Sequence, residues 1–175
     1  MRDVLGICCT QVGLAALDDL QVDALVLMPF KDERPLKGAA GFCDWRLNGR
    51  VSSLFLSGLY RAQPRDVLMM DTCGRIGSRW VFLFGQGKRY GMDLTIFRRN
   101  IRRMLETVKK ADMQSLALEL PGVDPGPLSA PEAVAAFLDE ARAIYRGAKI
   151  TLLSPFPRFS EFVHQVAADF DDVEI

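Results

Sequence analysis

The sequence predicts a three-layer α/β fold, in which a mixed, mostly parallel sheet lies between helices. Strand-like and helix-like segments alternate through the second half of the chain. Ala24–Met28 is a continuous apolar run, which is typical of a parallel strand buried on both faces. The connection between Val67–Met70 and Trp80–Phe84 is too short for a parallel crossover, so we expect an antiparallel strand pair within Val67–Phe84.

The first third of the chain contains four expected elements and one segment without a clear period, Val12–Leu20. Pro29 ends a strand, and the charged run Lys31–Pro35 is expected to form an exposed loop. Two glycines in the next helix, Gly38 and Gly41, would allow another backbone to approach closely. The four elements are a strand over Val4–Thr10, the strand Ala24–Met28, a helix over Leu36–Leu47 and a helix through Val51, Leu54 and Phe55.

The rest of the chain alternates helices and strands. Asp93 is expected to cap one helix, and the spacing of Ser129 and Glu132 predicts a capping box at another. Pro121-Gly122 breaks a strand, and Gly147 ends a helix. The apolar positions predict a helix through Leu94, Phe97, Ile101, Met104, Leu105 and Val108, a strand over Leu116–Leu120, a helix through Val134, Phe137, Leu138, Ala141, Ile144 and Tyr145, a strand over Ile150–Leu153, and a last helix burying Phe159, Phe162, Val163, Val166 and Phe170.

The composition predicts one globular domain over residues 1–175. Hydrophobic residues make up 49% of the chain, and 22 Lys and Arg balance 22 Asp and Glu. Because the formal net charge is zero, we expect no nucleic-acid or anionic-membrane partner. No apolar run approaches the roughly 20 residues that span a bilayer, and the N-terminus has no apolar signal-peptide core, so a cytoplasmic location is expected.

The four cysteines, Cys8, Cys9, Cys43 and Cys73, do not form a metal-binding pattern. There is no C-x-x-C pair, and the single histidine, His164, is remote in sequence. We expect reduced cysteines that act as small core residues, and we predict no metal site and no cofactor.

Five segments, in a fixed order, carry a resemblance to a known family. They are VDALVL (Val22–Leu27), FKDERPLKGAAG (Phe30–Gly41), the helix Leu47–Leu56, RAQPRDVLMM (Arg61–Met70) and RWVFLFGQGKR (Arg79–Arg89). Together they resemble the N-terminal domain of the leucyl aminopeptidase (cytosol aminopeptidase) family, over nearly the whole chain. The resemblance implies a fold similar to macro domains, which bind ADP-ribose.

The resemblance also implies what this chain would not do. In the family, catalysis belongs to a separate C-terminal domain with two divalent metals and an Asn-Thr-Asp-Ala-Glu-Gly-Arg motif, which this sequence does not contain. We expect Ile175 to lie about where that domain would begin. No catalytic residue or metal ligand carries over, and peptidase activity of this chain stays uncertain. The family's N-terminal domain is associated with hexamer assembly, which implies an assembly role here.

Three glycine-bearing loops after strands are candidate anion sites. Gly85-Gln86-Gly87-Lys88 could cradle a phosphate with backbone N–H groups and the Lys88 charge, or it could be a tight turn that needs glycine. The resemblance places Gly38–Gly41 where macro domains carry their diphosphate loop, although Met28-Pro29-Phe30 lacks the asparagines usual before it. Pro121–Gly126, with Gly122, is a candidate second wall. The candidate ligand-binding residues are Gly38, Gly41, Gly85, Gly87, Lys88 and Gly122.

Other candidate features have structural interpretations. The basic face from Arg98 to Lys110 lacks interleaved aromatics, which favours a solvated face paired with acidic neighbours over a nucleic-acid site. His164 is expected on the outer face of the last helix, without a nucleophile beside it. Trp45 and Trp80 are expected to be core or interface anchors rather than cofactor contacts.

Three functional hypotheses remain open at this point. The first is a non-catalytic module that acts in oligomer assembly or beside a protein partner. The second is a module that binds a small molecule, such as a nucleotide or another phosphate-bearing anion, at the glycine-bearing loops. The third is the N-terminal part of a longer metallo-aminopeptidase.

Overall fold

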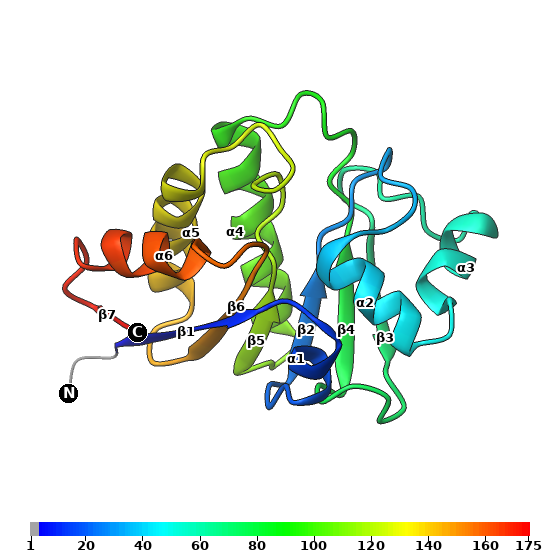
Figure 1. The fold of residues 1–175 in the computed structure, drawn as a ribbon, viewed down its shortest axis with the longest axis horizontal. Coiled ribbons are helices and arrows are strands. Elements are labelled where there is room, and N and C mark those ends of the chain that lie inside the picture. Colours follow the sequence, from blue (N-terminus) through cyan, green and yellow to red (C-terminus); the bar gives the residue numbers. More distant parts are fainter. Residues whose placement is uncertain (1–3) are drawn as a thin grey trace.

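The computed structural model describes residues 4–175 and contains a seven-stranded sheet with helices on both faces (Figure 1). The strands lie in the order β3-β4-β2-β5-β6-β1-β7. The strands are β1 (Leu5–Gln11), β2 (Ala24–Leu27), β3 (Val67–Asp71), β4 (Trp80–Phe84), β5 (Ser115–Leu118), β6 (Lys149–Ser154) and β7 (Val173–Glu174). The helices are α1 (Leu14–Asp18), α2 (Gly38–Arg46), α3 (Arg50–Leu56), α4 (Leu94–Lys110), α5 (Ala130–Ile144) and α6 (Phe159–Ala167).

The sheet is mixed, as the sequence predicts. β3 pairs with β4 in antiparallel register, with Val67 opposite Phe84 and Asp71 opposite Trp80. The other strand pairs are parallel. β2 is buried along its whole length because it lies inside the sheet with helices on both faces. The three-layer α/β architecture with an antiparallel pair in Val67–Phe84 is therefore confirmed.

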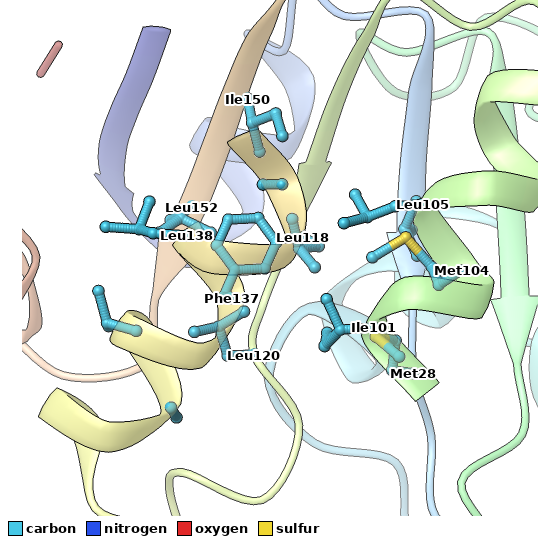
Figure 2. Packing of buried hydrophobic residues seen from close by; sticks show 14 of the residues in the cluster. Met28, Ile101, Met104, Leu105, Leu118, Leu120, Phe137, Leu138, Ile150 and Leu152 are labelled. Carbon is cyan, nitrogen blue, oxygen red and sulfur yellow. The ribbon is translucent and has the colours of Figure 1, made fainter. Parts of the chain in front are cut away.

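Two hydrophobic clusters lie on the two faces of the sheet. Figure 1 shows α4, α5 and α6 on one side and α2 and α3 on the other. On the first side, Ile101 and Leu105 of α4 and Phe137 of α5 pack with Leu118 of β5, all buried (Figure 2). On the second side, helices α1 to α3 cover Leu25 and the other inward residues of β2 and β4. These two clusters fix the sheet between the helical layers.

The helix starts confirm one predicted cap and correct another. The Asp93 Oδ1 accepts a 2.7 Å hydrogen bond from the Ile96 N–H, so Asp93 caps α4 as predicted. At α5, the Ser129 hydroxyl donates to the Glu132 carboxylate at 2.5 Å and makes no capping bond to the backbone. The capping-box prediction is therefore wrong in its bonding, although α5 does begin directly after Ser129.

Several expected boundaries differ from the structure. Val12–Leu20 contains the short helix α1, and the helix expected from Leu36 begins at Gly38. β5 ends at Leu118, two residues before the predicted end, so Glu119 and Leu120 lie in the loop that follows. This last difference matters most, because it brings the Glu119 carboxylate to the edge of the sheet. No helix within residues 4–175 is long and apolar enough to cross a membrane.

Candidate functional site

The topology creates a crevice at the carboxyl ends of β2 and β5. These two strands are parallel neighbours, so both end at the same edge of the sheet. The chain leaves β2 toward α2 on one face, and it leaves β5 toward α5 on the other (Figure 1). Adjacent strands whose connections go to opposite faces leave a gap between the two departing loops, which is the usual ligand position in open α/β sheets.

A cleft does occupy this position, and we call it the β2–β5 cleft. It encloses about 60 Å³. Because one water needs about 10–15 Å³ of such volume, this space corresponds to about four to six waters, so it takes one group of a ligand rather than a whole nucleotide. It is lined by Val26–Phe30 of β2 and its loop, Glu33, Lys37–Ala40 at the start of α2, Arg89, Glu119–Gly122 and Asp124.

Glu119 lines the cleft and contacts the first turn of α2. Its Oε2 accepts a 2.6 Å hydrogen bond from the Ala39 N–H. A helix N-terminus has free N–H groups and a partial positive charge, so a carboxylate is stabilised there. Gly38 makes the contact possible, because a Cβ at Gly38 would lie only 2.3 Å from the same oxygen.

Several charged groups surround Glu119. Burial raises the pKa of Glu119 to about 7, and the Ala39 hydrogen bond opposes this rise. The neighbouring carboxylates of Glu33 and Asp124 raise the pKa further, whereas Arg89 lowers it. The cleft thus holds an acidic group that titrates close to neutral pH, a property common at functional sites.

Arg89 is held in place by several partners. Its guanidinium donates to Glu33 Oε1 at 2.5 Å and lies 4.6 Å from the centre of the Phe30 ring. Its backbone N–H donates to Asp32 Oδ1 at 2.9 Å. These contacts tie the loop after β2 to the segment after β4. The positive charge of Arg89 is therefore paired with Glu33, at the lining of the cleft.

A second cation fixes the other side of the same loop. The Arg34 guanidinium carbon lies 3.4 Å from the centre of the Phe55 ring in α3, a cation–π contact. Phe55 in turn packs edge-on against Tyr60, with ring centres 5.1 Å apart. The loop that carries Glu33 and Lys37 is thus held by α3 through Arg34 and by the segment after β4 through Arg89.

Two of the six predicted ligand-binding residues line the cleft, and four do not. Gly38 and Gly122 are lining residues, from the two loops that were expected to face each other. Gly41, Gly85, Gly87 and Lys88 lie outside the lining. Ligand binding by any of these residues stays a prediction.

The Gly85–Lys88 segment uses its N–H groups within the protein. Gly85 donates to Asp66 O, Gln86 to Pro29 O and Gly87 to Ala62 O, at 2.9, 3.2 and 2.9 Å. A Cβ at Gly85 would lie 2.1 Å from the Gln63 carbonyl oxygen. Glycine is therefore required at Gly85 for close backbone approach, and Gly87 has a φ of +73°, as the tight-turn interpretation expects.

The central acidic residues were missed at the sequence level. Glu33, Glu119 and Asp124 belong to three loop positions, and only the fold brings them together. The one signal was Glu119 at the end of an otherwise apolar segment, LALEL, where a charge marks the strand end. The apolar residues on both sides of Glu119 instead predict a strand that runs to Leu120.

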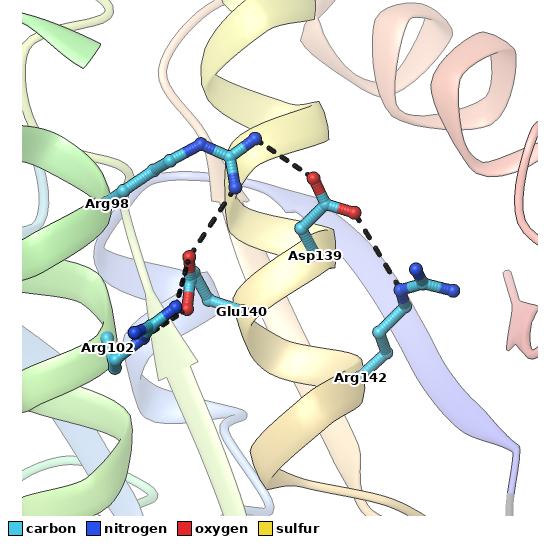
Figure 3. A network of polar contacts seen from close by, with 5 residues as sticks. All are labelled: Arg98, Arg102, Asp139, Glu140 and Arg142. Carbon is cyan, nitrogen blue, oxygen red and sulfur yellow. Dashed lines mark hydrogen bonds and ion pairs between the residues drawn. The ribbon is translucent and has the colours of Figure 1, made fainter. Parts of the chain in front are cut away.

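The basic face of α4 forms ion pairs with α5, as expected. Arg98 contacts Asp139 at 2.9 Å and Glu140 at 3.5 Å, and Arg102 contacts Glu140 at 2.8 Å (Figure 3). Asp139 also lies 3.7 Å from Arg142 (Figure 3). Glu140 is buried and fully paired, so this network joins two helices and leaves no unpaired carboxylate there.

The four cysteines and the histidine differ in how far they are buried. All four cysteines are free, and no group of three or more His, Cys, Asp or Glu in this range could hold a metal ion. Burial raises the pKa of Cys43 to about 12, so this core thiol stays protonated. Cys73 is exposed, which corrects its expected place in the core. His164 lies on the exposed face of α6, as expected.

Sequence comparison supports the resemblance over part of the chain. No protein-family model matches the sequence. A probable cytosol aminopeptidase from Sulfurihydrogenibium sp. (strain YO3AOP1) is 28% identical over 103 residues, which are 59% of this chain. The match covers 20% of that protein, so this chain corresponds to about a fifth of the curated relative it matches.

Solved structures confirm the macrodomain-like fold. The Oceanobacillus iheyensis macrodomain with bound MES has a TM-score of 0.71 at 11% identity and covers 93% of this chain and 89% of its own. The Trypanosoma brucei macrodomain in complex with ADP-ribose has a TM-score of 0.67 at 15% identity, over 91% and 68%. A tomato leucine aminopeptidase has a TM-score of 0.60 at 13% identity, over 93% of this chain and 35% of its own. The resemblance to cytosol aminopeptidases and to macrodomains is therefore confirmed.

Proposed function

We propose that this chain is a binding module whose β2–β5 cleft holds one polar group of a small ligand. The observation that carries the proposal is Glu119, a largely buried carboxylate that lines the cleft, bonds to the start of α2 and has a pKa of about 7. A buried ionisable group costs folding free energy, and such groups concentrate where a protein binds or reacts. The proposal assigns no reaction to the chain.

Two further observations support the cleft as the binding position. It lies where the connections of two adjacent strands separate, which is the usual ligand position in this class of fold. Macrodomains of the same fold are known with MES, ADP and ADP-ribose bound. Those ligands belong to those proteins, and the enclosed 60 Å³ here fits one group of such a molecule.

The experiment is a ¹H–¹⁵N NMR titration of the intact 175-residue chain. The probes are inorganic phosphate, ADP, ADP-ribose, ethylammonium and alaninamide. At least one probe should shift the amide signals of Gly38, Ala39 and Gly122 in a saturable way. The Gly77 amide, before the start of β4, is the internal control and should not move. If every probe leaves the cleft amides unchanged, the binding proposal fails.

A second candidate function, oligomer assembly or partner binding, is favoured by the β3 edge. β3 is the terminal strand of the sheet, and Val67 and Met69 on it are 39% and 45% exposed. An exposed apolar edge strand is a surface on which another chain can pair. Light scattering after size-exclusion chromatography should then give an oligomer for the wild type and a monomer for Met69→Lys. A wild-type monomer at high concentration would exclude assembly through this edge.

The third candidate is that the chain is part of a longer aminopeptidase with a cytoplasmic location. Its support is the match to a fifth of a probable cytosol aminopeptidase. Reading the frame beyond Ile175 for a metal-ligand motif tests the first half of this candidate. Fractionation of the source cells, followed by detection of the chain, tests the second half.

A further inference from the structure

We propose that Glu119 makes the β2–β5 cleft selective for a cationic ammonium group, such as the free amino group of an amino acid or peptide, over a phosphate. This inference rests on the proposed binding function and names the ligand class of the same site. The anion position in the cleft is already filled, the ionised carboxylates outnumber the cations, and the cavity has room for an ammonium group.

The N-terminus of α2 is the place in the cleft where an anion would be stabilised. The Glu119 carboxylate already occupies it, bonded to the Ala39 N–H at 2.6 Å. The space that a side chain at residue 38 would fill is taken by the same carboxylate. A phosphate would have to displace Glu119 and then lie beside the Glu33 and Asp124 carboxylates, whose charges would repel it.

The side chains that line the cleft include more carboxylates than cations. The cleft contains three carboxylates, of Glu33, Glu119 and Asp124, against two cations, Arg89 and Lys37. Arg89 is paired with Glu33. Among the ion pairs of residues 4–175, neither Glu119 nor Asp124 has a cationic partner. When Glu119 is ionised, the cleft therefore carries one more negative charge than positive charge, and a cation from outside would balance it.

The size of the cleft suits an ammonium group. The enclosed 60 Å³ accommodates an ammonium group and its attached carbon, with the rest of the ligand outside. Lys37 is exposed at the rim, where it can meet an acidic or carbonyl group of the outer part. An ammonium group donates up to three hydrogen bonds, and the carboxylate oxygens of Glu119 in the lining are acceptors for them.

The test compares charge variants of one small molecule on the intact chain. Alaninamide, which carries a free ammonium group, should shift the Ala39 amide signal, and N-acetyl-alaninamide, which carries none, should not. Ethylammonium separates a general amine site from an amino-acid site, and phosphate and ADP are the anionic probes. Glu119→Gln should weaken alaninamide binding about ten-fold or more, because it removes the charge and keeps the shape. Glu106→Gln, an exposed carboxylate of α4, is the matched control and should leave the affinity unchanged.

The pH dependence of binding to the wild type needs no variant. Between pH 6 and pH 8, the ionised fraction of Glu119 rises from about one tenth to about nine tenths, so ethylammonium affinity should rise about ten-fold. Ethylammonium is the suitable probe because aliphatic amines stay charged over this range. The other charged groups that face the cleft, Glu33, Asp124, Arg89 and Lys37, have to be included when the profile is fitted.

The outcomes separate this inference from the proposed function. If phosphate or ADP moves the Gly38–Ala40 amides of the wild type as strongly as alaninamide does, the cleft is a binding site and the ammonium selectivity is wrong. If Glu119→Gln binds alaninamide as tightly as the wild type, Glu119 does not set the selectivity. If neither cations nor anions move these amides, the binding function itself is refuted, and the inference falls with it.

Discussion

The protonation of Glu119 should make the stability of this protein depend on pH in an unusual direction. A carboxylate that ionises more easily in the folded state stabilises a protein as the pH rises. Glu119 does the opposite, because burial raises its pKa from an ordinary 4.5 to about 7. The folded protein therefore holds this proton more tightly than the unfolded chain does. Its contribution to stability is fully present below pH 4.5 and is lost as the pH rises to about 7.

The size of the effect follows from the shift in pKa. The difference between 4.5 and about 7 is 2.5 units, and each unit is worth about 1.4 kcal/mol, so the total is about 3 kcal/mol. Between pH 5 and pH 8, about 2 to 3 kcal/mol of this should be observed, since a small part is already lost at pH 5. This is a large part of the roughly 5–15 kcal/mol that stabilises a typical domain.

The perturbation that isolates this effect is Glu119→Gln. The amide is never charged, and its oxygen can still accept the hydrogen bond from Ala39. Urea denaturation at pH 5 and at pH 8, followed by circular dichroism, gives the free energy of unfolding for both proteins. The variant should gain about 2 to 3 kcal/mol relative to the wild type between the two pH values. The control Glu106→Gln should differ from the wild type by a nearly constant amount, because Glu106 is exposed.

One result would refute the reasoning. If the stability difference between wild type and Glu119→Gln is the same at pH 5 and pH 8, Glu119 does not carry a raised pKa. The carboxylate would then be solvated or paired in solution, and the buried environment described for the cleft would be wrong. A difference of the opposite sign would mean that a cation stabilises Glu119 in the free protein.

Substitutions at three further positions test other parts of the structure by denaturation. Gly38→Ala should lower the free energy of unfolding by about 2 kcal/mol or more, because residue 38 has a φ of +54° and a Cβ there meets the Glu119 carboxylate; a neutral effect would contradict the contact. Phe137→Ala should cost about 3–5 kcal/mol, because this fully buried ring joins α5 to the sheet, and a loss under 1 kcal/mol would disprove its core position. Asp93→Ala should cost about 1 kcal/mol and Asp93→Asn clearly less, because asparagine also caps helices.

The sequence predicted the fold well because the fold depends on local patterns. The apolar run of β2 and the short β3–β4 connection each depend on a few adjacent residues. The apolar stripe of α4 places Phe97, Ile101 and Leu105 in the core, as its spacing indicates. Patterns of this kind are repeated along a whole element, so one deviating residue changes little.

The site could not be predicted in the same way, because it depends on contacts between distant residues. Ala39 and Glu119 are 80 positions apart, and nothing in either segment indicates that they are bonded. The glycines were a poor guide to the position of the site, since both Gly85 and Gly38 lie in segments that follow a strand. Gly85 makes room for a backbone carbonyl, whereas Gly38 makes room for a carboxylate. Only the fold separates these two uses.

The macrodomain-like fold provides a position that suits an anion, whereas the carboxylates of the cleft favour a cation. We propose that these side chains, and not the fold, decide which ligand is bound. A fold sets where a ligand can lie, whereas the side chains at that position set which ligand is bound. Here the fold provides a helix N-terminus at the sheet edge, as an anion site requires, and the chain places its own carboxylate there. That carboxylate costs the free protein about 3 kcal/mol at pH 8. A bound cation would recover part of this free energy, so ligand affinity and the pH dependence of folding should have one origin, the ionisation of Glu119.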